Sequence, residues 1–167
     1  MSELHIAYLS LGSNIQPEIH LVRAMERLQT YGKLEKISNA WESASVGAEG
    51  PNYLNACVLL VTPLEQPALK EQALLPIEKD LGRKRSADKF APRTIDIDIV
   101  IFDDQSCDDK YWEQAFVVVP LAEIYPHYQN PLTKEAIGIT AARLRQQIWM
   151  EPHPQVLSTF SESRFNA

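Results

Sequence analysis

Two aspartates alternate with isoleucines in the segment from Pro92 to Phe102. Such alternation predicts a β-strand in which Asp96 and Asp98 share one face. Their Cα atoms would lie about 6.5–7 Å apart, so the two carboxylates repel each other unless a cation lies between them. A hard divalent ion such as Mg²⁺ prefers oxygen ligands of this kind. The pattern favours metal binding over a half-exposed strand that carries two aspartates by accident. The opposite face is predicted to hold Ile95, Ile97, Ile99 and Ile101.

A basic segment leads directly into this strand, although the chain has a formal net charge of −6. Its five cations within residues 83–93 are Arg83, Lys84, Arg85, Lys89 and Arg93. Mg²⁺ together with Arg and Lys side chains on polyphosphate oxygens is the recurring apparatus of phosphoryl transfer. A solvated basic loop is the usual meaning of such a run, but beside the two aspartates it indicates an enzyme that handles a nucleotide.

The run from Gly82 to Phe102 resembles the signature of the 6-hydroxymethyl-7,8-dihydropterin pyrophosphokinase family (2-amino-4-hydroxy-6-hydroxymethyldihydropteridine diphosphokinases) of folate biosynthesis. That family has a Pro-Arg-Thr-x-Asp-x-Asp strand after an Arg-rich loop, and the chain matches it without a gap. Five further segments resemble the family in the same order: residues 9–14, 41–47, 51–56, 77–83 and 116–124.

The resemblance implies transfer of pyrophosphate from MgATP to the hydroxymethyl group of the reduced pterin, giving AMP and the pterin diphosphate. The implied catalytic residues are Arg83, Arg93, Asp96 and Asp98, and the two aspartates would bind two Mg²⁺ ions. The implied ATP-binding residues are Glu78, Arg83, Arg85, Lys89, Phe90, Arg93 and Ile99. The implied pterin-binding residues are Ser43, Val46, Gly47, Tyr53, Asn55 and Phe116.

Tyr53 and Asn55 also alternate and so share a strand face. Spacing alone favours a plain surface pair, whereas the resemblance implies that the ring stacks on the pterin and the amide reads its edge.

Some positions depart from the family pattern. The stretch 110–115 lacks the His and Arg that the family commonly has there, and Lys110 is its one cation. Phe90 replaces a usual Trp, Ala91 a usual Gly and Ser45 a usual Pro. Two alternatives therefore stay open: a non-catalytic ligand-binding paralogue on the same fold, and a pyrophosphokinase with a changed acceptor.

Length and composition bound the class of protein. A chain of 167 residues with 45% hydrophobic residues suits one domain, which we place at residues 1–150 with an irregular tail at 151–167. The acidic balance argues against nucleic-acid or membrane partners, and no apolar run approaches the ~20 residues of a membrane span. Two cysteines without a paired spacing favour a reduced, cytoplasmic setting. The expected partners are the small-molecule pterin and ATP that the resemblance implies, with no obligate protein partner. The P-loop pattern is absent from the sequence.

Periodicity predicts an α+β fold of the ferredoxin-like β-α-β-β-α-β kind, an antiparallel sheet with helices on one face. The expected strands are 5–11, 34–41, 53–61, the strand with the two aspartates, and 116–119. The expected helices are about 18–30, 64–81 with Pro76 kinking or dividing it, and 133–147. Tyr111 and Trp112 are expected in a polar loop with partial packing.

Overall fold

One antiparallel sheet organises the molecule, as seen in the computed structural model, which describes residues 3–47, 49–84 and 91–160. Its strands within these ranges are β1 His5–Ser13, β2 Lys33–Ile37, β3 Ala40–Ser43, β4 Tyr53–Thr62, β5 Asp96–Phe102, β6 Gln105–Ser106 and β7 Met150–His153. They lie in the order β6-β5-β1-β4-β3-β7, and β2 also pairs with β4. The expected strand 34–41 is divided into β2 and β3.

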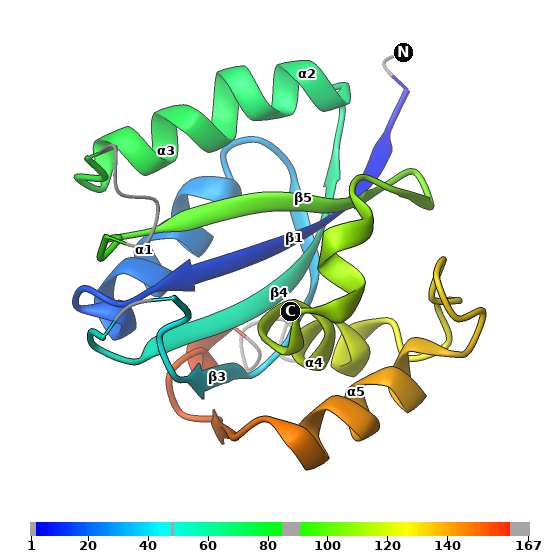
Figure 1. Cartoon of the computed structure of the whole chain (residues 1–167). Helices are drawn as coiled ribbons and strands as arrows, with labels where there is room; N and C mark the ends of the chain where they lie inside the picture. The colour runs from blue at the N-terminus through cyan, green and yellow to red at the C-terminus, as the bar shows by residue number, and fades with distance from the viewer. Residues whose placement is uncertain (1–2, 48, 85–90, 161–167) are drawn as a thin grey trace.

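The helices that connect the strands complete a ferredoxin-like topology, which confirms the predicted α+β class (Figure 1). Helix α1 (Pro17–Leu28) joins β1 to β2, and a helical rod joins β4 to β5. The rod comprises α2 (Gln66–Ala68), a π-helical segment η1 (Leu69–Leu74) and α3 (Leu75–Asp80). Pro76 lies in the first turn of α3, where its missing N–H is tolerated, and the wider π turns precede it. None of the helices in the described ranges is long and apolar enough to cross a membrane.

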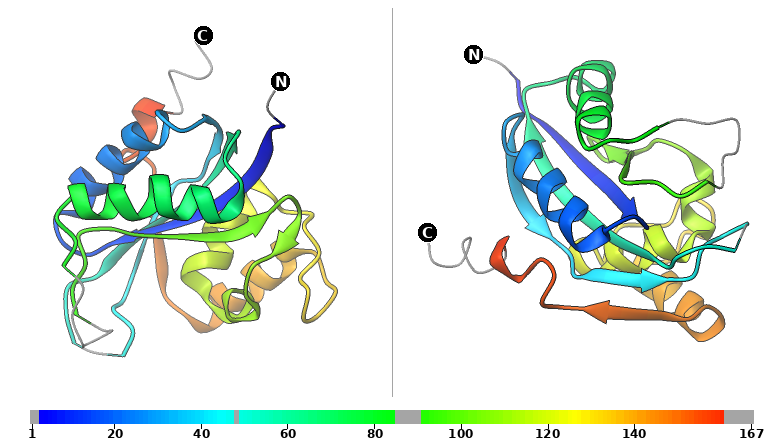
Figure 2. Two further views of the ribbon diagram at one scale, coloured as in Figure 1. Left: turned by 90° about the horizontal axis from the view of Figure 1, so that it is seen from above. Right: turned by 90° about the vertical axis from the view of Figure 1, so that its left-hand side faces the viewer.

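A second set of helices packs on the opposite face of the sheet: η2 (Asp109–Glu113, a 3₁₀ helix), α4 (Ala115–Ile124) and α5 (Ile137–Gln147). The sheet therefore separates two cores, and Figure 2 shows the helices that cover its two faces. The first core joins Leu9 of β1 to α1 and the rod. The second joins Tyr8 to α4 and α5 and includes Trp112, which is fully buried rather than partly packed in a loop.

The predictions of a strand at 116–119 and of helices on one face only are wrong. The Val117-Val118-Val119 run favours a strand by its β-branched side chains, but in the structure it lies in α4. Seven of the ten residues of α4 are buried, so the helix shows no amphipathic period that could have identified it. Burial between the sheet and α5 outweighs the local preference of the valines.

A β-bulge corrects the assignment of one isoleucine. Tyr8 pairs with Ile101 and Leu9 with Ile99, so Val100 is the extra residue of β5. Ile95, Ile97 and Ile99 lie in the first core as expected, but Ile101 lies with Tyr8 in the second. After the bulge, the side chains of β5 therefore point to the opposite faces from those that strict alternation predicts.

The C-terminal segment differs from the irregular tail that was expected at 151–167. Residues 150–153 form β7, which pairs with β3, and Leu157 is buried in the first core. Residues 161–167 lie outside the described ranges.

Candidate active site

The second face of the sheet is apolar at one end and polar at the other, and a cavity of about 420 Å³ lies at the polar end. Along β1, Tyr8 belongs to the second core, whereas Ser10 and Gly12 line the cavity. Ser10 pairs with Asp98 and Gly12 with Asp96, so the register of β1 against β5 collects these groups on one floor. A Cβ at Gly12 would meet Asn55 Oδ1 at 3.4 Å, so glycine keeps this floor open.

Eight predicted site residues line the cavity: Ser43, Val46, Tyr53, Asn55, Arg93, Asp96, Asp98 and Phe116. Five lining residues stand outside the predicted site set, although the sequence offers Lys110 as a partial substitute for the missing His and Arg: Ser10, Gly12, Ala44, Lys110 and Gln114. The cavity walls thus come from β1, β3 and the loop after it, β4, β5, η2 and the start of α4.

Asp96 is held between two arginines. Its Oδ1 accepts a hydrogen bond from Arg83 Nη1 at 2.6 Å, and its Oδ2 accepts one from Arg93 Nη1 at 3.1 Å. Burial would lower the pKa of the Arg83 guanidinium, but the charges of Asp96 and Glu78 raise it above its ordinary value. Arg83 therefore stays cationic beside Asp96, where it can serve an anionic ligand.

Glu78 holds the Arg83 guanidinium in place from outside the cavity. Its buried carboxylate Oε2 accepts hydrogen bonds from Arg83 Nη1 at 2.6 Å and from the Ile97 amide at 2.8 Å. Glu78 does not line the cavity, so the structure gives it the position of a residue that orients Arg83 and fixes α3 to β5.

Asp98 lies beside Asp96 on the cavity floor and is half-buried. Burial first, and the charge of Asp96 second, raise the pKa of Asp98 to about 6. A carboxylate in this position resists ionisation unless a cation accompanies it. Two oxygen-donor groups facing one cavity, one of them short of counter-charge, fit a hard divalent ion such as Mg²⁺.

The other end of the cavity has an aromatic and amide character. Asn55 is buried, and its Nδ2 donates to the Trp41 carbonyl at 3.0 Å and to Ser43 Oγ at 2.8 Å. Both amide hydrogens are thereby used, and Oδ1 remains as an acceptor on the Gly12 side of the cavity. The Tyr53 and Phe116 side chains line the same space, so a flat heterocycle with N–H donors at its edge fits here.

Val46 lines the cavity with an exposed side chain, and Gly47, the next residue, has φ 83°, a left-handed conformation that suits glycine. The remaining predicted residues take other places. The Ile99 side chain lies in the first core, so only its main chain could reach a ligand. The predicted nucleotide contacts Arg85, Lys89 and Phe90 lie outside the described residues.

Asn14 is a site-building residue that the sequence reasoning missed. Its main-chain N–H donates to the Arg93 carbonyl at 3.1 Å, and its side-chain Oδ1 accepts from the Arg93 main-chain N–H at 2.7 Å. This reciprocal pair fixes the segment that carries Arg93 to the end of β1. In the sequence, the only signal for Asn14 is the turn cluster Gly12-Ser13-Asn14, because its partner Arg93 lies 79 residues further along the chain.

Comparisons with known proteins identify the family of this chain. Residues 8–126 match the family model described as 7,8-dihydro-6-hydroxymethylpterin-pyrophosphokinase (HPPK). The 2-amino-4-hydroxy-6-hydroxymethyldihydropteridine pyrophosphokinase of Synechocystis sp. is 34% identical over 157 residues, covering 87% of this chain and 77% of that protein. The protein of the same name from Aquifex aeolicus is 35% identical over 143 residues, covering 78% and 86%.

A solved structure extends the likeness to the fold. The chain of wild-type Plasmodium falciparum HPPK-DHPS with pteroate matches with a TM-score of 0.66 at 13% identity. The match covers 88% of this chain but 44% of that one, so this chain spans under half of its length. With the family model and the two relatives, the predicted resemblance is confirmed: the chain belongs to the 7,8-dihydro-6-hydroxymethylpterin-pyrophosphokinase family.

Proposed function

We infer that this chain is an ATP-dependent pyrophosphokinase of folate biosynthesis, whose acceptor is the hydroxymethyl group of 6-hydroxymethyl-7,8-dihydropterin. The hydroxyl oxygen forms a bond to the β-phosphorus of ATP, the bond from that phosphorus to the α,β-bridging oxygen breaks, and AMP leaves. The products are AMP, the pterin diphosphate and a proton. One observation beyond the family membership carries this inference: a single cavity combines the heterocycle-binding wall of Tyr53, Asn55 and Phe116 with the carboxylates of Asp96 and Asp98.

The pterin wall acts by shape and by hydrogen bonding. Tyr53 and Phe116 provide rings on which a bicyclic heterocycle stacks, and the fixed Oδ1 of Asn55 accepts a hydrogen bond from its N–H edge. Ser43 holds the Asn55 amide in that orientation. A volume of about 420 Å³ lies within the range of small-molecule sites. Val46 and Gly47, at the mouth, would close over the bound ring.

The phosphate side acts by charge. Asp96 and Asp98 would hold Mg²⁺, and we propose two ions. When bound, Mg²⁺ neutralises phosphate charge and lowers the pKa of the acceptor hydroxyl. Arg83 and Arg93 already contact Asp96, and each has further N–H donors that would stabilise charge on the transferring group. Arg85, Lys89, Phe90 and the main chain of Ile99 are proposed to bind the nucleotide.

Lys110 bears on the alternative of a non-catalytic paralogue. The stretch 110–115 lacks the family's usual His and Arg, yet Lys110 and Gln114 line the cavity. The positive charge of Lys110 opposes the rise in the pKa of Asp98, so the two groups interact across the site. A cation therefore remains at this wall for an anionic substrate, which favours an active enzyme.

Production of AMP from ATP tests the proposal. With Mg²⁺ and 6-hydroxymethyl-7,8-dihydropterin, AMP and pterin diphosphate should appear in equal amounts. With the 6-methyl pterin, which lacks the hydroxyl, no AMP should form. AMP without any pterin product would show hydrolysis, and pterin binding without AMP would support the non-catalytic paralogue.

The two cysteines suit the reduced, cytoplasmic setting that we propose. Both are free thiols, and Cys57 is buried. We propose the pterin and ATP as the ligands, without a nucleic-acid or obligate protein partner.

A further inference from the structure

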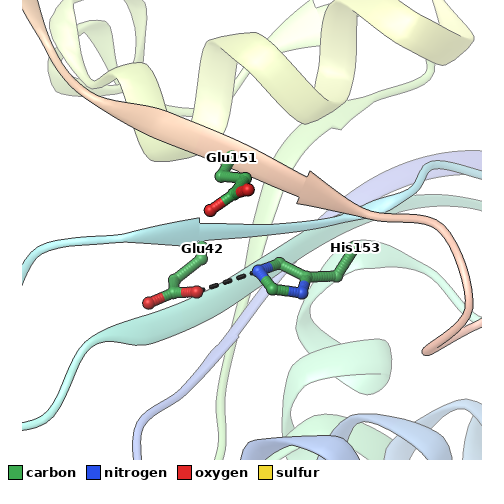
Figure 3. A group of neighbouring side chains, drawn as sticks. All are labelled: Glu42, Glu151 and His153. Carbon is green, nitrogen blue, oxygen red and sulfur yellow. Dashed lines mark hydrogen bonds and ion pairs between the residues drawn. The ribbon is translucent and has the colours of Figure 1, made fainter.

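A second group of metal-ligating side chains lies at the sheet edge where β7 joins β3. Figure 3 shows Glu42 on β3 and Glu151 and His153 on β7, which point toward one another. One ligand atom from each residue lies within 4.8 Å of the others. His153 Nε2 is 2.8 Å from Glu42 Oε1.

The register of the two strands places like charges face to face. Glu42 and Glu151 are direct cross-strand partners, an arrangement that is destabilising for two carboxylates without a counter-ion. Glu42 Oε2 accepts a hydrogen bond from Asn52 Nδ2 at 2.7 Å. Within the described residues, the Glu151 carboxylate has no hydrogen bond or ion pair. The group therefore has ligand capacity and excess negative charge.

We propose that Glu42, Glu151 and His153 form a binding site for a divalent transition-metal ion such as Zn²⁺. Imidazole nitrogen with carboxylate oxygens is a ligand set that Zn²⁺ and its neighbours in the first transition row accept, whereas Mg²⁺ prefers oxygen alone. The site is thus chemically different from the all-oxygen pair Asp96 and Asp98.

The three side chains can reach the distances of metal coordination by their own movement, without a change in the backbone. Zn–N and Zn–O bonds of about 2.0–2.2 Å place two ligands of a tetrahedral ion about 3.4 Å apart. Ligand atoms up to 4.8 Å apart must therefore approach by roughly 1–1.5 Å. Glu151 is exposed and can turn about its own torsions, and a water molecule would complete the fourth position.

The position of the site gives the ion a structural role. In the described sheet β7 pairs with β3 alone, so an ion shared by the two strands would hold β7 in place. Glu42 directly precedes Ser43, which lines the active-site cavity on the other face of β3. Occupancy would therefore also fix the strand that carries one wall of the pterin site.

Cobalt binding provides the test, because Co²⁺ is a coloured substitute for Zn²⁺ and its visible absorption reports nitrogen and oxygen ligation. Nucleotide-free protein is titrated with Co²⁺ and, separately, with Zn²⁺ by calorimetry. The ligand variants are Glu151→Gln and His153→Gln, which remove one donor each from exposed or half-exposed positions. The controls are His127→Gln, an exposed histidine elsewhere, Cys107→Ser, and Asp98→Asn in the active site.

Wild type should bind one ion whose visible spectrum shows nitrogen ligation, independent of Asp98, and any ion at the all-oxygen pair Asp96 and Asp98 should lack that feature. Each ligand variant should bind at least about tenfold more weakly, since even outer-shell changes cost 10–100-fold in metal affinity. The three controls should retain the wild-type affinity and spectrum. Unchanged binding in Glu151→Gln and His153→Gln, loss of binding in Asp98→Asn or Cys107→Ser, or no binding by wild type would each overturn the proposal.

Discussion

Replacing Asp98 with asparagine is expected to end turnover and yet stabilise the protein in the absence of nucleotide and metal. The wild-type side chain carries a pKa of about 6 in the folded protein against an ordinary value of 3.8, because it is partly buried and lies beside Asp96. Between these two pH values the folded protein keeps a proton that the unfolded chain has lost. Stability therefore falls as pH rises from about 4 to about 6.

The size of the effect follows from the shift. A difference of about two pH units at 1.36 kcal/mol per unit is on the order of 3 kcal/mol. Asparagine is similar in size and cannot ionise, so it removes this pH-dependent destabilisation. The variant should match wild type near pH 4 and exceed it by up to about 3 kcal/mol at pH 7.5.

Urea denaturation with a chelator at pH 4.5, 5.5 and 7.5 measures the difference. Asp109→Asn, at an exposed position in η2, is the matched control and should follow wild type at every pH. MgATP should stabilise wild type more than Asp98→Asn. If Asp98→Asn is no more stable than wild type at pH 7.5, the burial and like-charge account of Asp98 is refuted. AMP production near the wild-type rate would instead refute its metal role.

Three further changes test other parts of the structure. Arg83→Lys keeps the charge but loses the planar guanidinium, so kcat and kcat/KM for ATP should both fall more than tenfold. The pterin affinity, measured by calorimetry, should not change, and a raised pterin KM alone would contradict this prediction. Lys110→Met should raise the KM for ATP several-fold, and unchanged kinetics would remove Lys110 from the site. Gly32→Ala should lower the free energy of unfolding, measured by thermal melts, by about 1–3 kcal/mol, because its Cβ would lie 2.3 Å from the Val61 carbonyl oxygen. Gly50→Ala is the control: its Cβ has room, so the free energy of unfolding should change little.

The fold could be predicted wherever a segment shows its own period. The alternation in β5 and the helical spacing in α1 each depend on one face being buried and the other not, and both segments were identified. Helix α4 is buried nearly all round, so no period distinguishes it from a buried strand. The bulge at Val100 is likewise invisible, because it depends on how β1 pairs with β5.

The residues of the candidate site likewise divide into those that the sequence could predict and those that it could not. Asp96 and Asp98 could be identified because strand spacing alone places them together, and the family resemblance pointed to Tyr53, Asn55 and Phe116, which line the same cavity. Ser10 could not be identified, since its place opposite Asp98 follows from the pairing of strands almost ninety residues apart. Phe116 was expected on a strand, and it reaches the same cavity from the first turn of a helix.

The central place of β1 has a consequence for synthesis of the chain. One edge of β1 pairs with β4, and the other pairs with β5, which starts 83 residues after β1 ends. At about 5–20 residues per second, a ribosome needs roughly 4–17 s to make that stretch. During this time the middle strand of the sheet has an open edge beside apolar side chains, in the form most prone to pair with another chain. The nascent protein is therefore at greatest risk of aggregation before Phe102 has left the ribosome. Variants that slow the pairing of β5 with β1 should lower the soluble yield, and this loss should exceed the one expected from their effect on the stability of the folded protein.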